Sequence, residues 1–331
     1  MSIHQGRLQL SLACGDYEIT RPLVEGRIRP DGIDLVSLTR DTERIFRRER
    51  RRECDVAEHN LFAFLADHAA GDDVVAIPVF PHRRFRLGSI FVPATSIVRD
   101  PHELAGGRIG IGGYQPAAAV WLRGILEDHY ELPAETVNWY DVFGRVGQLP
   151  DGLAAPLPAD DPSSRFEIDR FLVDGRLDAM ISAYDPAGLR ASAPTVRRLF
   201  DDVAAHERAY YRDTGLFPIM HVITLRRSLV QRHPWVPASL FEAFVRSRHE
   251  ALQRLTNPRT LPLAFGQSAW QEQAEILGPD PWQYGLTEAN RRVLATAVDY
   301  AVRQRLIPGP VTSEELFAPV DAEVAAGHEI R

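Results

Sequence analysis

Four basic residues follow an apolar segment in the first third of the chain. Residues 74–80 are a continuous apolar run, which is typical of a buried strand in a parallel sheet, and His82, Arg83, Arg84 and Arg86 come directly after it. Guanidinium groups bind carboxylates through paired hydrogen bonds, and a histidine can donate a proton. Alternation along a strand would place His82, Arg84 and Arg86 on one face. The cluster is therefore either a surface group at a strand end or a clamp for a dianionic ligand.

A second group of polar residues stands where a predicted strand leads into an apolar helix. Glu58, His59 and Asn60 occupy this turn. A buried acid and a buried base are costly unless they are paired, so we expect Glu58 and His59 to share a hydrogen bond. His221 lies in another apolar strand, predicted over residues 217–227. A single histidine there is either a hydrogen-bonded core residue or a ligand-binding group.

Three further loops carry candidate binding residues. They are Asp16, Tyr17 and Arg21 after the first strand, Tyr114 and Gln115 in a glycine-rich turn, and Tyr184 in a loop after a short strand. Open α/β sheets bind ligands where strands end, and a helix that begins behind glycines suits an anion. The glycine spacing before Tyr114 does not match a dinucleotide-binding fingerprint. A strand or helix precedes and follows each loop, as in an open α/β sheet.

Composition excludes several kinds of chemistry. The 331 residues carry a net charge of −7, so a nucleic-acid partner is not expected. All 38 basic residues other than histidine are arginine, and without lysine no side-chain Schiff base can form. Pyridoxal phosphate in its usual role is thereby excluded. The sequence has no metal-binding motif, and we expect neither a metal nor an organic cofactor.

The beginning of the chain indicates where the protein resides. The apolar stretch near the N-terminus is short and interrupted by Gln9 and Ser11, unlike a secretory signal peptide. No run approaches the length of a membrane span, so we expect a cytoplasmic protein without a membrane partner. A lipid-bearing cysteine at Cys14 is the alternative. Cys14 and Cys54 permit one disulfide at most, and the oligomeric state, a homo-oligomer included, stays open.

Several long motifs resemble the 4,5-dihydroxyphthalate decarboxylase family. They are ACGDYEITRPL with RPDGIDL, IPVFPHRRFRLGSIF, AVWLRGILEDHY, TGLFPIMHV, HPWVP, LPLAF and GPDPWQYGLTEANRR, and they extend from about residue 7 to residue 318. The resemblance implies an α/β fold similar to type II periplasmic binding proteins, with two lobes and a ligand cleft between them. One lobe would comprise residues 1–95 and 213–331, and the other residues 96–212. The basic segment 42–54 is expected to form a helix with a solvated face.

The resemblance implies non-oxidative decarboxylation of a hydroxylated aromatic diacid, most simply 4,5-dihydroxyphthalate to protocatechuate and CO2, without an organic cofactor. The partner would be a small aromatic acid. We expect carboxylate binding by Arg83, Arg84 and Arg86, proton delivery by His82 or His59, and contacts to the ring hydroxyls from Asp16, Tyr17 and His221. Glu58 is grouped with the catalytic residues, and Arg21, Asn60, Tyr114, Gln115 and Tyr184 with the substrate-binding ones.

Three positions depart from the family's pattern. The family's HRRFRH-type run ends here in Leu87, so a histidine that could act as the acid is replaced. His59 stands where a small or apolar residue is expected and would compensate, and Tyr184 replaces another polar residue. The alternatives are a cytoplasmic solute-binding or sensor protein of the same fold without catalysis, and another enzyme on that fold.

Overall fold

The computed structural model describes residues 3–4, 6–39, 53–142, 155–156, 169–257 and 259–320. These residues form two compact units, and each unit is built from helices and one mixed β-sheet. Unit 1 comprises Met1–Arg83, Ile219–Thr296 and Gly309–Arg331, and unit 2 comprises Arg84–Pro218 and Ala297–Pro308. The helix predicted over residues 42–54 lies almost entirely outside the described residues.

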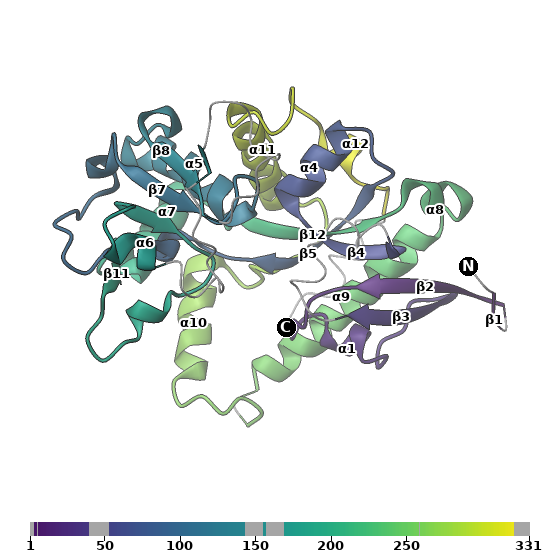
Figure 1. Cartoon of the computed structure of the whole chain (residues 1–331). Helices are drawn as coiled ribbons and strands as arrows, with labels where there is room; N and C mark the ends of the chain where they lie inside the picture. Colours follow the sequence, from purple (N-terminus) through teal and green to yellow (C-terminus); the bar gives the residue numbers. More distant parts are fainter. Residues whose placement is uncertain are drawn as a thin grey trace. The chain divides into compact units, whose positions relative to one another are not determined.

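Unit 1 is organised around a six-stranded sheet (Figure 1). Its order is β1-β2-β4-β12-β5, with β3 paired to β2. The strands are β1 (Ile3–His4), β2 (Arg7–Ala13), β3 (Ile33–Thr39), β4 (Val56–Asn60), β5 (Val75–Arg83) and β12 (Ile219–Leu225). The helices with residues in this unit are α1 (Arg21–Val24), α4 (Leu61–Ala69), α8 (Arg227–Arg232), α9 (Val236–Leu255), α10 (Gly266–Leu277), α11 (Glu288–Arg303) and α12 (Ser313–Leu316). In Figure 1, α1 lies along α9.

The apolar run of β5 predicts a strand that is parallel to its neighbours, and the structure shows a different direction. β5 pairs antiparallel with β12, and β12 also pairs antiparallel with β4, whereas β2 and β4 are parallel. The run is apolar because Ala76, Ile77, Val79 and Phe80 are all buried, and burial from both faces does not require a parallel neighbour. The chain leaves unit 1 at the end of β5 and returns at the start of β12.

Unit 2 holds the second sheet, in the order β11-β6-β10-β7-β8-β9. The strands are β6 (Ile90–Pro93), β7 (Arg108–Ile111), β8 (Asn138–Asp141), β9 (Ala155–Pro156), β10 (Ala179–Ile181) and β11 (Val196–Arg198). Its helices are α5 (Ala117–Tyr130), α6 (Arg170–Val173), α7 (Val203–Thr214), the part of α11 from Ala297 onward, and the short 3-10 turns η1 (Leu87–Ser89), η2 (Pro101–Leu104), η3 (Ala134–Thr136) and η4 (Ala187–Leu189).

The units divide the chain at positions that differ from the predicted boundaries. Residues 84–95, 213–218 and 297–308 fall in unit 2. For the first of these segments the reason is strand pairing, because β6 lies between β10 and β11 in the second sheet. An apolar strand such as β6 fits either sheet by its pattern alone, and only its partners decide the unit.

The structure bears on two expectations about the whole chain, which concern a membrane span and a disulfide. No helix among the described residues combines the length and the apolar character that a membrane crossing requires. Cys14 and Cys54 are both buried and no disulfide joins them. Burial raises the pKa of the Cys14 thiol well above its ordinary value, so this thiol stays protonated.

Candidate active site

The antiparallel pairing of β4 with β12 decides which polar side chains meet. Ile223 lies opposite Glu58, Val222 opposite His59, and His221 opposite Asn60. Directly opposed residues point to the same face of a sheet, and successive residues point to opposite faces. Glu58 and His221 therefore share one face, and His59 lies on the other.

Glu58 is the centre of a buried hydrogen-bond network. Its side chain has no exposed surface. Oε1 accepts hydrogen bonds from the Tyr17 hydroxyl at 2.6 Å and from His221 Nδ1 at 2.5 Å, and Oε2 accepts one from the Gly15 amide at 2.7 Å. The Tyr17 hydroxyl also lies 3.4 Å from His221 Nδ1. A buried carboxylate needs such donors, because an unbalanced charge in the interior is costly.

The same contacts determine the ionisation of Glu58. Burial on its own would raise the pKa of this carboxyl group. The charge of His221 and hydrogen bonds from His221, Tyr17 and the Gly15 amide outweigh burial and hold the pKa of Glu58 below its usual range. Glu58 is consequently a carboxylate at neutral pH, and it acts as a fixed hydrogen-bond acceptor for the imidazole.

His82 adds a second imidazole to this network. It lies opposite His221 in the β5–β12 ladder, and the two ring centroids are 4.7 Å apart. The ring of Tyr17 stacks on His82 with a centroid distance of 5.6 Å and an interplanar angle of 23°. Tyr17, Glu58, His82 and His221 thus form one cluster, which we call the histidine cluster. All four residues belong to unit 1.

The histidine cluster has the parts of a proton-transfer site. Because Glu58 holds Nδ1 of His221, a proton exchange between this ring and another molecule would use Nε2. A carboxylate that orients an imidazole and stabilises its charged form is a recurring arrangement in general acid–base catalysis. Glu58, His82 and His221 come from three strands of one sheet, and Tyr17 comes from the loop after β2, so the sheet fixes the geometry of three of the four members.

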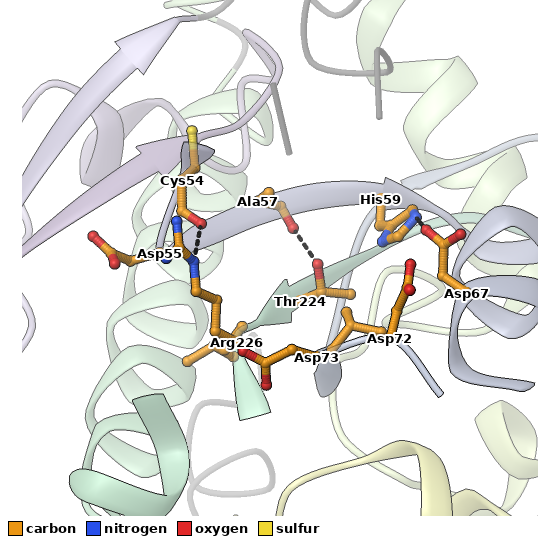
Figure 2. A pocket seen from close by; sticks show the side chains of 11 residues that line it. Cys54, Asp55, Ala57, His59, Asp67, Asp72, Asp73, Thr224 and Arg226 are labelled. Atoms are coloured by element: carbon orange, nitrogen blue, oxygen red, sulfur yellow. Dashed lines mark hydrogen bonds and ion pairs between the residues drawn. The ribbon is translucent and has the colours of Figure 1, made fainter. Parts of the chain in front are cut away.

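His59 does not pair with Glu58 as the sequence led us to expect. Its Nε2 lies 3.2 Å from Asp67 Oδ2 of α4, on the other face of β4. Figure 2 shows the two side chains turned toward each other in a cavity of about 300 Å³ that Asp72, Asp73 and Arg226 also line. The expected pairing is wrong because adjacent residues of a strand point in opposite directions.

The arginines after β5 do not form one row of side chains. β5 ends at Arg83, so strand alternation does not continue through Arg84 and Arg86, contrary to the expected common face with His82. Arg83 is buried, and its Nη2 donates to the Gln283 carbonyl at 3.1 Å and to Asn290 Oδ1 at 2.5 Å. Arg84 is exposed and Arg86 is buried beside η1. Each guanidinium therefore has a different environment.

The remaining candidates of unit 1 have structural contacts of their own. Arg21 forms ion pairs with Asp16 at 3.3 Å and with Glu18 at 2.7 Å on the surface. Asn60 is the N-cap of α4, where its Oδ1 accepts the amides of Phe62 and Ala63. The loop after β2 consequently brings only Tyr17 and the Gly15 amide into the histidine cluster.

Three predicted site residues lie in unit 2 in addition to Arg84 and Arg86. Tyr114 is buried against Arg123, Gln115 is half-buried in the turn before α5, and Tyr184 is exposed after β10. Leu87, which replaces the family's histidine, is buried at the start of η1. No group of three or more histidine, cysteine, aspartate or glutamate side chains within the described residues is arranged to hold a metal.

Sequence reasoning missed several contributors to the site. The Gly15 amide carries no side-chain signal, and Asn290 is 207 residues from the arginine that it binds. Asp67 stood on an apolar helix and gave no sign of its contact with His59. Only the folded chain brings these groups together.

Comparison with known proteins identifies relatives along the whole chain. No model of a protein family matches it. The chain is 34% identical over 329 residues to the 4,5-dihydroxyphthalate decarboxylase of Comamonas testosteroni, covering 96% of this chain and 98% of that protein. It is 33% identical over 216 residues to the enzyme of the same name from Pseudomonas putida, covering 63% of this chain and 84% of that protein.

Solved structures show the fold. The aliphatic sulphonate binding protein SsuA of Escherichia coli aligns with a TM-score of 0.55 at 15% identity, over 94% of this chain and 97% of that one. A sulfonate-binding protein of Methylobacillus flagellatus gives 0.57 at 12% identity, over 98% and 94%. The desulfurization enzyme DSZB gives 0.50 at 16%, over 97% and 99%.

These neighbours confirm the expected two-lobed α/β fold of periplasmic binding proteins, on which both binding proteins and an enzyme are built. The resemblance read from the sequence motifs is confirmed by the two relatives. At 34% identity over nearly all of both proteins, the chain belongs to the 4,5-dihydroxyphthalate decarboxylase family of carboxy-lyases.

Proposed function

We propose that the protein decarboxylates 4,5-dihydroxyphthalate to protocatechuate and CO2 by protonating the ring carbon that bears the departing carboxylate. The observation that supports this most is the Glu58–His221 pair, in which a fully buried carboxylate holds an imidazole at Nδ1 at 2.5 Å. The names of the relatives supply the substrate, and the pair supplies a proton donor of the kind that the reaction requires.

The chemistry follows from the substitution pattern of the ring. The hydroxyl para to the departing carboxylate loses its proton, and its electrons move through the ring to the carbon that bears that carboxylate. This carbon accepts a proton from a general acid, which gives a dienone. The carbon–carboxylate bond then breaks, its electrons restore the aromatic ring as a phenolate, and CO2 leaves. The phenolate finally takes back the proton that the hydroxyl lost at the start. The sum is one proton taken up and one CO2 released for each substrate.

Within the histidine cluster, we assign the two proton-transfer steps to different histidines. The two rings are neighbours in this cluster, with centroids 4.7 Å apart. Glu58 holds Nδ1 of His221 and orients that ring, so we assign the general acid to His221. His82 then accepts the proton of the phenolic hydroxyl.

The sequence suggested that His221 contacts a ring hydroxyl and that His82 delivers the proton. The roles proposed here differ, because His221 is the general acid and His82 accepts the phenolic proton. Both reassignments follow from the position of Glu58, which contacts His221. His59 contacts Asp67 on the other face of β4, so we assign it no proton-transfer role. We retain Arg84 and Arg86 as proposed carboxylate ligands. We do not retain Arg83 as a carboxylate ligand, because its Nη2 already donates hydrogen bonds to Asn290 and Gln283.

Turnover of purified protein tests the proposal. Incubation with 4,5-dihydroxyphthalate should yield protocatechuate and an equal amount of CO2, followed by chromatography and a CO2 assay. Two analogues make the test sharper. 4-Hydroxyphthalate keeps one para hydroxyl and should react, whereas phthalate lacks it and should bind without releasing CO2. Tight binding of 4,5-dihydroxyphthalate without CO2 release would instead indicate a binding protein on the same fold.

A further inference from the structure

Arg123 is a fully buried arginine that forms no ion pair with a carboxylate among the described residues. It lies in α5 and has no exposed surface. Nε donates to Gln304 Oε1 at 2.7 Å and Nη2 to the Tyr114 carbonyl at 2.6 Å, both neutral acceptors. Within the described part of the chain, Nη1 has no hydrogen-bond acceptor. A buried charge without a counter-charge is costly, so a nearby anion would stabilise it.

Arg123 keeps its charge at neutral pH. Burial lowers its pKa to about 10, which is still well above neutrality. Its guanidinium carbon lies 3.8 Å from the centroid of the Tyr114 ring, so the charge sits directly behind the turn that precedes α5. The charge of Arg123 thus acts on this turn from inside the protein.

The start of α5 offers amide donors at the same place. The N-cap Pro116 gives no side-chain hydrogen bond, and the first turn contains no acidic residue. Tyr114, Ala117 and Ala118 are more than nine-tenths buried. Among the residues that the structure describes, no group accepts their backbone amide hydrogens. The first amides of a helix have no acceptor within the helix, and amides at a helix start bind anions.

The turn is also accessible to solvent, and its backbone allows a ligand to approach closely. Gly112, Gln115 and Pro116 are only half-buried, so a ligand can reach them from solvent. Gly113 has φ of 116°, which a residue with a side chain rarely adopts. The turn therefore presents backbone rather than side chains to a ligand.

From these observations we propose that unit 2 carries a carboxylate-binding site at the start of α5. The amides of Tyr114, Ala117 and Ala118 bind the carboxylate, and Arg123 is a positioning residue whose charge stabilises it from behind. The inference rests on the proposed function in one respect, because the ligand is a carboxylate of an aromatic diacid. It also explains why Gln115 and Tyr114 stand in a glycine-rich turn.

Arg305 is a second positive charge that acts on the turn. Burial raises the pKa of the Tyr114 hydroxyl, while Arg123 and Arg305 oppose that rise. Asp141 ends β8 opposite Ile111, is buried, and is a negative charge at the same edge of the sheet.

Calorimetry with phthalate tests the role of Arg123 in the full chain, because phthalate has both carboxylates and no reactive hydroxyl. We expect Arg123→Gln to weaken phthalate binding roughly tenfold, and Arg123→Lys, which keeps the charge, to stay within about threefold of the native protein. Arg108→Gln is the matched control. It removes an arginine of β7 that is already paired with Asp178 at 2.9 Å, and it should leave affinity unchanged.

Catechol has the ring hydroxyls and no carboxylate, so its binding separates a charge effect from damage to the fold. The affinity for catechol should be equal in the native protein, Arg123→Gln, Arg123→Lys and Arg108→Gln. Equal phthalate affinity in Arg123→Gln and native protein overturns the proposal. A parallel loss of catechol binding in Arg123→Gln also overturns it, because the loss then reflects a general change in structure.

Amide resonances of the native protein provide a second measurement that needs no variant. Titration with phthalate should shift the amide signals of Tyr114, Ala117 and Ala118. Saturable binding that shifts other amides and leaves these three unchanged contradicts the site. If turnover of 4,5-dihydroxyphthalate persists in that case, only this inference fails. Absence of both phthalate binding and turnover removes the proposed function as well.

Discussion

Neighbouring residues of β4 illustrate how the chemistry depends on a single position. Glu58 and His59 are adjacent in the chain, yet Glu58 contacts His221 and Tyr17 while His59 contacts Asp67. Residue types alone suggested that the acid and base would pair with each other. The alternation of the strand separates them, and the register with β12 supplies the partners that they have.

The depressed pKa of Glu58 predicts how stability depends on pH. A carboxyl group whose pKa is lower in the folded state stabilises that state at pH values above its unfolded pKa, and this contribution is lost as the pH falls through the folded pKa. The free energy of unfolding of the native protein should therefore exceed that of Glu58→Gln at neutral pH. The difference should shrink steadily below the ordinary value of 4.5.

Denaturant unfolding of both proteins across this range measures the effect. The control is Glu135→Gln, because Glu135 is exposed in the 3-10 turn η3, and its removal should have a small effect at every pH. A difference between native protein and Glu58→Gln that grows as the solution is acidified would contradict the account.

At the scale of elements, the sequence predicted strands better than their partners. Alternation and apolar runs located β2, β5 and β12, and they placed a strand-to-helix turn at residues 58–60. Pairing is a long-range property, since β12 is separated from β4 and β5 by more than a hundred residues. The antiparallel direction of β5 and the Glu58–His221 contact depend on that pairing, so no local pattern contains them.

The arginine cluster shows a second limit. The charge after β5 was evident from the sequence, but its division between a buried Arg83, an exposed Arg84 and a buried Arg86 was not. That division depends on where β5 ends and on the contact of Arg83 with Asn290 in α11. A strand end is set by hydrogen bonds to neighbours, which alternation cannot reveal.

The junction of β4 with α4 gives a prediction for one element. Asn60 caps α4 by accepting the amides of Phe62 and Ala63, so Asn60→Ala should lower the free energy of unfolding by about 1 kcal/mol. Asn60→Asp keeps a capping oxygen and should restore most of the loss. Thermal unfolding followed by circular dichroism measures both, with kcat/KM recorded in parallel.

The cap is separable from a role in binding. If Asn60 acts only on α4, kcat/KM at a temperature where both variants are folded should stay within about threefold of the native value. A large rise in KM for Asn60→Asp, with stability intact, would show that the side chain meets the dianionic substrate instead.

At the scale of the whole molecule, composition restricts the mechanism. The dienone formed by ring protonation is a ketone, which an enzyme with a nearby lysine could capture as a Schiff base. This chain has no lysine. Borohydride added during turnover should therefore leave activity and the mass of every peptide unchanged. Inactivation that requires substrate, with a matching mass increase on one peptide, would indicate a covalent route.

The resemblance of the motifs to a known family predicted more about the protein than any local pattern did. It gave the two-lobed fold, which the solved structures confirm, and the family, which the relatives confirm. It did not indicate which side chains meet, because Leu87 replaces the expected histidine and is buried in unit 2. The contacts of Glu58 supply the assignment that the motifs left open.

The central claim is that Glu58 and His221 carry the proton transfer, and one comparison tests it most directly. Initial rates with 4,5-dihydroxyphthalate should be measured for the native protein, Glu58→Gln and His59→Asn. We expect kcat to fall by about 10²- to 10⁴-fold in Glu58→Gln and to stay within about threefold in His59→Asn, because His59 lies on the other face of β4. Native kcat in Glu58→Gln, or an equal loss in His59→Asn, would contradict the account.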